Sequence, residues 1–215
     1  MHNGKTVVLV TVRAEFERHG WWHPLLGAWL LSLSQEETYA MAIELVNGYA
    51  GYAASANACA SAFEKKFPEA DWLCIVDNDN VPPPDVLRML DDAPEYADII
   101  SPLTQMVVED KVYRQSGFYE GTGAERKFFP LPLEATGLCE VDRVGGGCWF
   151  IRRRVFDKME KPYFRILFNP DTYQMVVSDD IFFQTEAKKR GFRIFCDTRF
   201  ECSHYHTRDL SLGTS

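Results

Sequence analysis

The hydrophobic and polar positions of the chain predict buried strands that alternate with helices. Residues 6–10 read Thr-Val-Val-Leu-Val and residues 72–76 read Trp-Leu-Cys-Ile-Val, without polar alternation. Such runs are typical of strands that are covered on both faces, as in an α/β sheet. Between them the pattern predicts a strand at 41–46 and a helix at 51–63, whose many Ala, Ser and Gly residues let it lie close to the sheet. Strand, helix and strand with short links predict a βαβ unit and an α/β fold.

The remaining elements extend the same pattern toward the C-terminus. Helices are predicted from Pro24 to about Ser32, at 84–90, around Arg152–Arg154 and at 181–189, and strands at 98–103, 192–196 and 199–202. The three arginines are interpreted as a solvated helix face. Gly191 follows the 181–189 helix at a position where glycine ends helices. Residues 107–138 are interpreted as a hairpin and loops. We expect one domain over residues 1–208 and a flexible tail over 209–215.

Composition narrows the class of protein. The chain has 215 residues, of which 46% are hydrophobic and 25% are charged, as in an ordinary soluble domain. Its net charge of −8 argues against a general nucleic-acid binder, because affinity for phosphate backbones needs basic surface. The charge does not exclude a nucleotide, whose phosphates a metal can bind.

The cysteines and the apolar runs indicate the compartment. The six cysteines form no Cys-x-x-Cys pair, and several lie in apolar runs, which favours reduced thiols in the cytoplasm over a disulfide framework. No apolar run approaches the ~20 residues that span a bilayer. The first five residues do not resemble a signal peptide. We therefore expect a soluble protein without a membrane span, and the sequence leaves its oligomeric state open.

Two carboxylates follow the central apolar run directly. Asp77 and Asp79 lie in Asp-Asn-Asp-Asn, with three prolines behind them at 82–84. Ligands of open α/β sheets bind just beyond the carboxyl ends of such strands. Two oxygen ligands there suit Mg²⁺ or Mn²⁺ and, through the metal, a diphosphate. The alternative is an acidic turn that uses Asp and Asn as turn formers. An EF-hand is excluded, because Val81 occupies the third ligand position.

Three further stretches could take part in chemistry. Ser178-Asp179-Asp180 precedes a helix, so it could cap the helix or place a general base at a cleft. His204-Tyr205-His206 could supply a metal ligand or structural histidines. Gly145-Gly146-Gly147 would allow the backbone to approach a ligand closely, or could mark a bend in a strand.

In this order, these motifs resemble the GT-A glycosyltransferases, particularly the small family-2-like bacterial and phage enzymes. The likeness spans roughly residues 6 to 206 and comprises the Asp-x-Asp, the glycine run leading to Arg152–Arg153, the acidic pair before a helix and the terminal histidine. It implies a Rossmann-like mixed central sheet flanked by helices. It also implies a nucleotide-diphospho-sugar donor, such as a UDP- or GDP-sugar, bound through Mn²⁺ or Mg²⁺, and an unidentified hydroxyl acceptor.

The resemblance assigns roles to individual residues. It implies that Asp77 contacts the ribose or the metal, that Asp79 binds the metal, and that His204 completes the protein ligands, with His206 as the fallback. Asp180 would be the base of an inverting transfer, with Asp179 as its rival. The remaining donor contacts would come from Thr11, Arg13, Asn57, Gly146 and Gly147.

Some positions depart from the family pattern. Ala56 replaces the usual arginine before Asn57, and Asp179 replaces the usual glutamate. Two other functions stay open: a sugar-phosphate nucleotidyltransferase, and a non-catalytic nucleotide- or carbohydrate-binding module. The first usually has a glycine-rich, basic loop after its first strand, whereas residues 11–17 here are acidic and lack glycine. Retaining stereochemistry is a further alternative.

Overall fold

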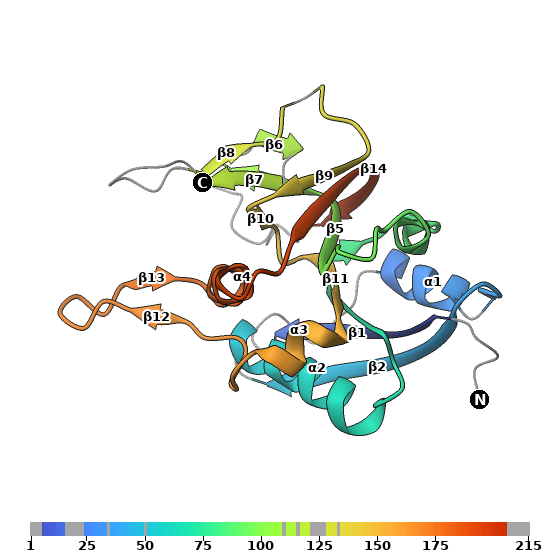
Figure 1. Ribbon diagram of the computed structural model, residues 1–215, viewed down its shortest axis with the longest axis horizontal. Coiled ribbons are helices and arrows are strands. Elements are labelled where there is room, and N and C mark those ends of the chain that lie inside the picture. Colours follow the sequence, from blue (N-terminus) through green and yellow to red (C-terminus); the bar gives the residue numbers. More distant parts are fainter. Residues whose placement is uncertain are drawn as a thin grey trace, which may run out of the picture.

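The computed structural model describes residues 6–15, 24–33, 35–49, 51–108, 111–114, 117–120, 128–132 and 134–205. A large mixed sheet forms the centre of the molecule, and helices cover both of its faces (Figure 1). The α/β fold class predicted from the sequence is therefore confirmed. His206 and the predicted tail at 209–215 lie outside the described residues.

In the described part of the chain the large sheet has nine strands. Seven of them lie in the order β2-β1-β3-β11-β5-β14-β4, while β6 pairs with β5 and β9 pairs with β14. The strands are β1 (Val7–Glu15), β2 (Ala40–Tyr49), β3 (Trp72–Asp77), β4 (Asn80–Val81), β5 (Ile99–Val108), β6 (Lys111–Arg114), β9 (Leu138–Val141), β11 (Cys148–Arg152) and β14 (Ile194–His204).

Strand direction decides which loops meet. β1 runs parallel to β2 and β3, and β14 runs parallel to β5. β11 is antiparallel to both β3 and β5, so β3 and β5 share one direction. The carboxyl ends of β1, β3, β5 and β14 therefore lie at one edge of the sheet, together with the beginning of β11. The loop after β3 and the glycine run before β11 meet at this edge.

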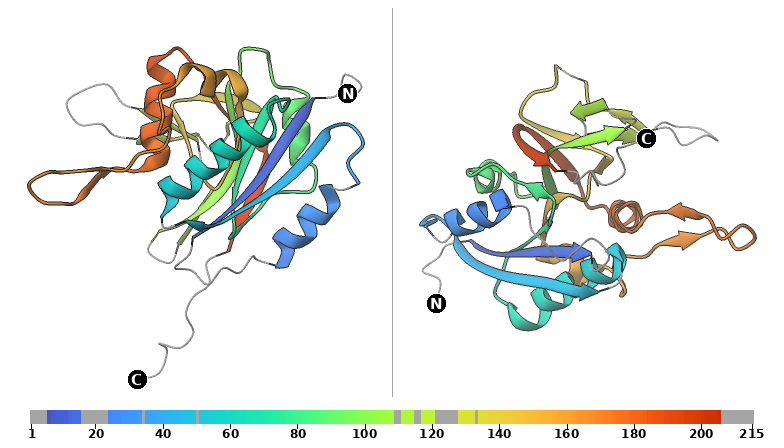
Figure 2. Two further views of the ribbon diagram at one scale, coloured as in Figure 1. Left: turned by 90° about the horizontal axis from the view of Figure 1, so that it is seen from below. Right: turned by 180° about the vertical axis from the view of Figure 1, so that it is seen from behind.

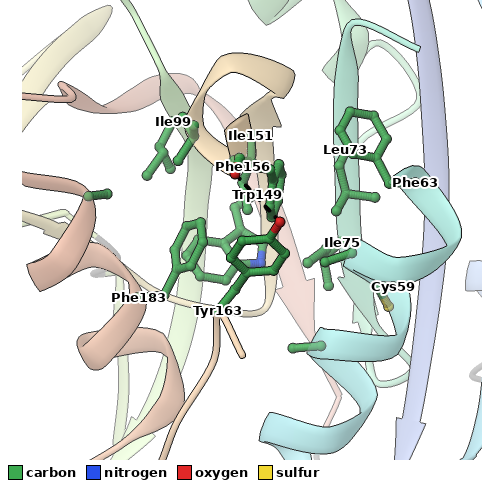
Figure 3. Packing of buried hydrophobic residues seen from close by; sticks show 14 of the residues in the cluster. Cys59, Phe63, Leu73, Ile75, Ile99, Trp149, Ile151, Phe156, Tyr163 and Phe183 are labelled. Atoms are coloured by element: carbon green, nitrogen blue, oxygen red, sulfur yellow. Dashed lines mark hydrogen bonds between the residues drawn. The ribbon is translucent and has the colours of Figure 1, made fainter. Parts of the chain in front are cut away.

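The helices and a short 3₁₀ helix bury the two faces of the sheet. They are α1 (Pro24–Leu33), α2 (Tyr52–Lys66), η1 (Val86–Leu90), α3 (Arg153–Lys158) and α4 (Asp179–Lys189). One apolar cluster joins the sheet to α2, α3 and α4, and a second joins it to α1 and η1. In the first, Trp149 packs edge-on against Phe183 with ring centroids 5.5 Å apart (Figure 3). Successive residues of β3 point into opposite clusters, which explains its uninterrupted apolar sequence.

Two smaller sheets flank this core. One consists of β10 (Arg143–Val144), β7 (Gly117–Glu120) and β8 (Phe128–Pro130), and the other is a hairpin of β12 (Leu167–Phe168) and β13 (Met175–Val177). The hairpin projects from the body of the molecule and leads directly into α4 (Figures 1 and 2). It exposes large apolar side chains, including Phe168, Tyr173 and Met175.

Several predicted boundaries were wrong. The two last predicted strands form the single strand β14, whose pairing with β5 shifts register between Asp197 and Glu201. Within this irregular stretch, buried Asp197 accepts hydrogen bonds from the Arg199 guanidinium. The predicted helix at 84–90 is a 3₁₀ turn that begins at Val86, after the prolines. β2 continues past the expected stop at Asn47-Gly48.

The prediction that Arg152–Arg154 form a solvated face was also wrong. α3 begins at Arg153, so Arg152 is the last residue of β11. Each guanidinium binds another segment: Arg152 donates to Ala97 O (2.7 Å), Arg153 to Ala70 O (2.7 Å) and Arg154 to Asp98 Oδ1 (2.6 Å). Two of these side chains thus reach backbone carbonyls and the third reaches a carboxylate, contacts that periodicity alone does not reveal.

Candidate functional site

The loop after β3 places its polar side chains at the edge of the sheet. β3 is buried up to Val76, and Asp77, Asn78 and Asp79 are half-buried. The Asp77 N–H donates to the Gly147 carbonyl at 2.9 Å, which joins this loop to the glycine run. Asp77 is also the strand partner of Arg13 at the end of β1, although the side chain of Arg13 lies outside the described part of the chain.

Asp79 and His204 lie side by side. The imidazole Nε2 of His204 is 3.3 Å from Asp79 Oδ2, as close as two ligands of one cation would need to be, and their role as metal ligands stays a prediction. Their backbones are held by strand pairing, because Asn80 in β4 lies opposite His204 in β14. The Tyr205 N–H also donates to the Asp79 carbonyl at 2.8 Å. A contact across 125 residues of sequence thus rests on backbone hydrogen bonds next to both side chains.

The Asp79–His204 pair fits a divalent cation. One carboxylate oxygen and one imidazole nitrogen suit a metal such as Mn²⁺, whereas Mg²⁺ prefers oxygen ligands alone. Across the described ranges, no three Asp, Glu, His or Cys side chains come together as a complete metal site. Two protein ligands leave coordination positions for diphosphate oxygens and water. The role of Asp77 as a third ligand stays a prediction.

The glycine run packs directly on the loop after β3. A Cβ atom at Gly147 would lie 2.7 Å from Asn80 Oδ1 and 2.8 Å from Asn80 Nδ2, which is too close for any side chain. Glycine at position 147 is therefore explained by the approach of Asn80. Gly146 is half-buried in the turn before β11, and its predicted contact with a donor stays a prediction.

The acidic pair opens α4, with Ser178 as the N-cap residue. The Ser178 hydroxyl donates to Asp180 Oδ1 instead of capping a backbone N–H, and the Ile181 N–H donates to the same oxygen at 2.8 Å. Asp180 is half-buried, whereas Asp179 is only 6% exposed. Both carboxylates lie in the first turn of α4, at the end of the helix where the backbone N–H groups point outward.

Gln184 joins α4 by hydrogen bonds to Val144, the residue before the glycine run, a role that the sequence did not indicate. Its side chain accepts the Val144 N–H at 2.7 Å and donates to the Val144 carbonyl at 3.0 Å. It also donates to the Asp180 carbonyl at 3.1 Å. The acidic pair is thereby tied to the residue that precedes the glycine run. A buried glutamine on a helix gives no sequence signal that distinguishes it from a surface glutamine.

Two residues predicted to contact the nucleotide-sugar, Thr11 and Asn57, instead form hydrogen bonds within the protein. Thr11 is fully buried, and its hydroxyl donates to the Cys74 carbonyl at 2.9 Å. The Asn57 amide group donates to the carbonyls of Ala53 (2.7 Å) and Phe164 (2.8 Å), so it links α2 to the segment before β12. The structure does not bring these side chains to the Asp79–His204 pair, and their contact with a donor stays a prediction.

Three buried thiols, Cys74 in β3, Cys148 in β11 and Cys202 in β14, lie in strands that meet this edge. Burial raises the pKa of the Cys74 and Cys202 thiols, so both are protonated at neutral pH. All six cysteines of the chain are free.

Sequence comparison identifies one family. A sequence model described as "Glycosyltransferase like family 2" matches residues 36–214. The matched segment includes the loop after β3, the glycine run, the acidic pair and His204. A comparison with curated protein sequences found no match. The described part of the chain contains no helix that is long and apolar enough to cross a membrane.

Solved structures of low sequence identity share the fold. The chain is similar to A197 from STIV with a TM-score of 0.62 and 16% identity, over 94% of this chain and 86% of that one. It is similar to GalNAc-T7, crystallised with UDP, GalNAc and Mn²⁺, with a TM-score of 0.55 and 12% identity. That match covers 98% of this chain but 46% of the GalNAc-T7 chain.

A third similar structure is the inositol-1-phosphate CTP transferase from T. maritima. Its TM-score is 0.50 at 11% identity, over 95% of this chain and 91% of that one. Together with the family match, these structures confirm the GT-A fold. At such identities the structural likeness establishes the fold and leaves the chemistry to the site.

Proposed function

Because the chain belongs to the glycosyltransferase like family 2, we propose that it transfers a sugar from a nucleotide-diphospho-sugar to an acceptor hydroxyl, with a divalent cation and with inversion. The observation that supports this most directly is the 3.3 Å approach of His204 Nε2 to Asp79 Oδ2 at the end of a buried strand. Residues 1–208 would form this single catalytic domain.

Asp79 and His204 would hold the cation, and Asp77 would bind either the cation or the donor ribose. When bound, a divalent cation offsets the negative charge that develops on the departing diphosphate. Arg13 is the strand partner of Asp77 at the same edge, which supports its proposed contact with the nucleotide. Gly146 would let the backbone approach the donor.

Asp180 would remove the proton from the acceptor hydroxyl. Its Oδ1 is engaged by the Ser178 hydroxyl and the Ile181 N–H, and no group in the described part of the chain binds Oδ2. That second oxygen can accept the proton while the first is held in place. Asp179 is buried more deeply and suits a supporting role. General base catalysis of this kind typically contributes ~10²–10⁴-fold to the rate.

Nucleoside diphosphate binding tests the metal site. Calorimetry with UDP and GDP, with and without Mn²⁺, should show binding that depends on Mn²⁺ and is lost in Asp77→Ala, Asp79→Ala and His204→Ala. Asp85→Ala is a matched control, because Asp85 is exposed and makes no side-chain capping bond at η1. Equal binding with and without Mn²⁺, or unchanged binding in the three variants, would contradict the proposed metal site.

Product analysis tests the reaction class. The likeness to the CTP transferase supports a sugar-phosphate nucleotidyltransferase as the second candidate. That enzyme would consume a nucleoside triphosphate and a sugar phosphate and release pyrophosphate. A glycosyltransferase would instead release a nucleoside diphosphate from a nucleotide-sugar. Slow release is expected even without the natural acceptor, with water as the acceptor. A protein that binds nucleotide-sugars but releases neither product would be a binding module.

A further inference from the structure

Asn80 is a buried side chain next to Asp79 that the proposed function does not use. It is 1% exposed, and its Nδ2 donates to Asp79 Oδ1 at 3.0 Å. An ionised carboxylate only accepts hydrogen bonds, so the amide must turn its nitrogen toward Asp79. The other carboxylate oxygen, Oδ2, faces His204 Nε2 at 3.3 Å. One oxygen of Asp79 is thus bound by Asn80, and the second faces His204.

Gly147 holds the Asn80 amide from the opposite side. A Cβ at position 147 would lie 2.7 Å from Asn80 Oδ1 and 2.8 Å from both Cγ and Nδ2. The amide plane therefore rests against the Gly147 backbone. Because Asn80 is almost fully buried, it has little room to rotate away.

Stability does not explain the Asn80 side chain well. The β4–β14 pairing that brings Asp79 to His204 uses backbone atoms and would survive the loss of the amide. Among the described residues, no donor reaches Asn80 Oδ1, which is buried without a hydrogen bond. An unpaired buried oxygen destabilises the fold. The amide is best explained by the bond that it donates to Asp79.

We infer that Asn80 is a positioning residue: its amide orients the Asp79 carboxylate so that Oδ2 faces the cation shared with His204, and position 147 is glycine to make room for that amide. This inference rests on the proposed function. Partners that orient a metal ligand typically change metal affinity by ~10–100-fold when removed.

A double-mutant cycle with Mn²⁺ as the probe tests the inference. Mn²⁺ affinity is measured by calorimetry, and the bound ion by its electron paramagnetic resonance spectrum, for the wild type, Asn80→Ala, Gly147→Ala and the double variant. Asn80→Ala should weaken Mn²⁺ binding by ~10–100-fold. Gly147→Ala should also weaken it, because the new methyl group displaces the amide. The double variant should bind no more weakly than Asn80→Ala alone, since the methyl group then has space.

Two controls match the chemistry of the changes. Gly27→Ala adds a Cβ in α1 that meets no atom within 4 Å, and Asn169→Ala removes an asparagine from the turn of the β12–β13 hairpin. Both should bind Mn²⁺ as the wild type does. Circular dichroism at the binding temperature verifies that each variant is folded.

Each contrary result has a distinct meaning. Wild-type Mn²⁺ affinity in Asn80→Ala, with or without a lower melting temperature, would overturn the inference and make the amide merely structural. Losses that add in the double variant would overturn the role of Gly147. If Asp79→Ala abolishes Mn²⁺ binding and Asn80→Ala keeps the wild-type affinity, the inference fails while the proposed function stands. If neither the wild type nor Asp79→Ala binds Mn²⁺, both fail.

Discussion

Gln184 binds both backbone polar groups of Val144. The Val144 N–H donates to its amide oxygen at 2.7 Å, and its amide nitrogen donates to the Val144 carbonyl at 3.0 Å. This pairing resembles a strand ladder in which a side chain replaces the second strand. It connects the helix of the acidic pair to the strand that enters the glycine run.

Replacing Gln184 should therefore destabilise the protein. Gln184→Ala leaves the buried N–H and C=O of Val144 unpaired, and it should lower the free energy of unfolding by ~1–3 kcal/mol. Urea unfolding monitored by circular dichroism measures the change. Gln174→Ala, in the exposed hairpin, is the matched control and should stay within ~0.5 kcal/mol of the wild type. A loss at position 184 no larger than in this control would show that the Val144 bonds are dispensable.

Replacing Asp180 should lower kcat more than replacing Asp179. Asp180→Asn keeps the size of the side chain but cannot take a proton, so kcat should fall by at least ~10²-fold with little change in donor affinity. Asp179→Asn should reduce kcat less. Steady-state kinetics with a nucleotide-sugar measures both variants. The reverse order of severity would move the base to Asp179, and near-normal turnover in both would favour a retaining mechanism.

Glu64 should make folding stability depend on pH at the acid end. Burial alone would raise the pKa of Glu64, but hydrogen bonds from Lys161 Nζ and the Tyr163 hydroxyl, each at 2.7 Å, outweigh it and lower the pKa below its usual 4.5. The unfolded chain therefore takes up the proton more readily than the folded chain. Stability from this group is complete above the unfolded pKa and is lost as the pH falls through the folded one.

The variant Glu64→Gln tests this dependence. It should be less stable than the wild type at pH 7, and the difference should shrink as the pH falls below about 4.5. Thermal unfolding at a series of pH values measures it. Glu160→Gln, an exposed glutamate near the end of α3, is the control. A difference between Glu64→Gln and wild type that is constant from pH 7 to pH 3 would contradict the assignment.

Arg153 should contribute to stability through its contacts with the end of α2. Its guanidinium donates to the carbonyls of Phe67 and Ala70, both at 2.7 Å, and lies 3.9 Å from the centre of the Phe63 ring. Arg153→Met keeps a long apolar side chain and removes these bonds, so the free energy of unfolding should fall by ~1–3 kcal/mol. Lys158→Met, exposed in the same helix, should change it little. Equal stability of the two variants would restore the interpretation of a solvated face.

The buried strands and the place of the acidic loop could be predicted from the order of the residues alone. Five apolar residues from Trp72 to Val76 require cover on both faces, and that requirement does not depend on which helices supply it. The position of Asp77 at the end of the strand and of Asp79 beyond it follows from chain order alone. The order of the motifs also sufficed to indicate the GT-A fold, because each motif belongs to a different strand or helix of that fold.

The contacts between distant side chains could not be predicted in this way. Asn80 and Gln184 are ordinary polar residues in sequence, and their partners, Gly147 and Val144, lie 67 and 40 residues away. Arg153 shows the same limit, since a helical period cannot distinguish an arginine in water from one that binds distant carbonyls. Periodicity reports the burial of apolar faces, whereas hydrogen bonds between distant segments depend on strand order and register. Those are properties of the assembled sheet and not of any local stretch.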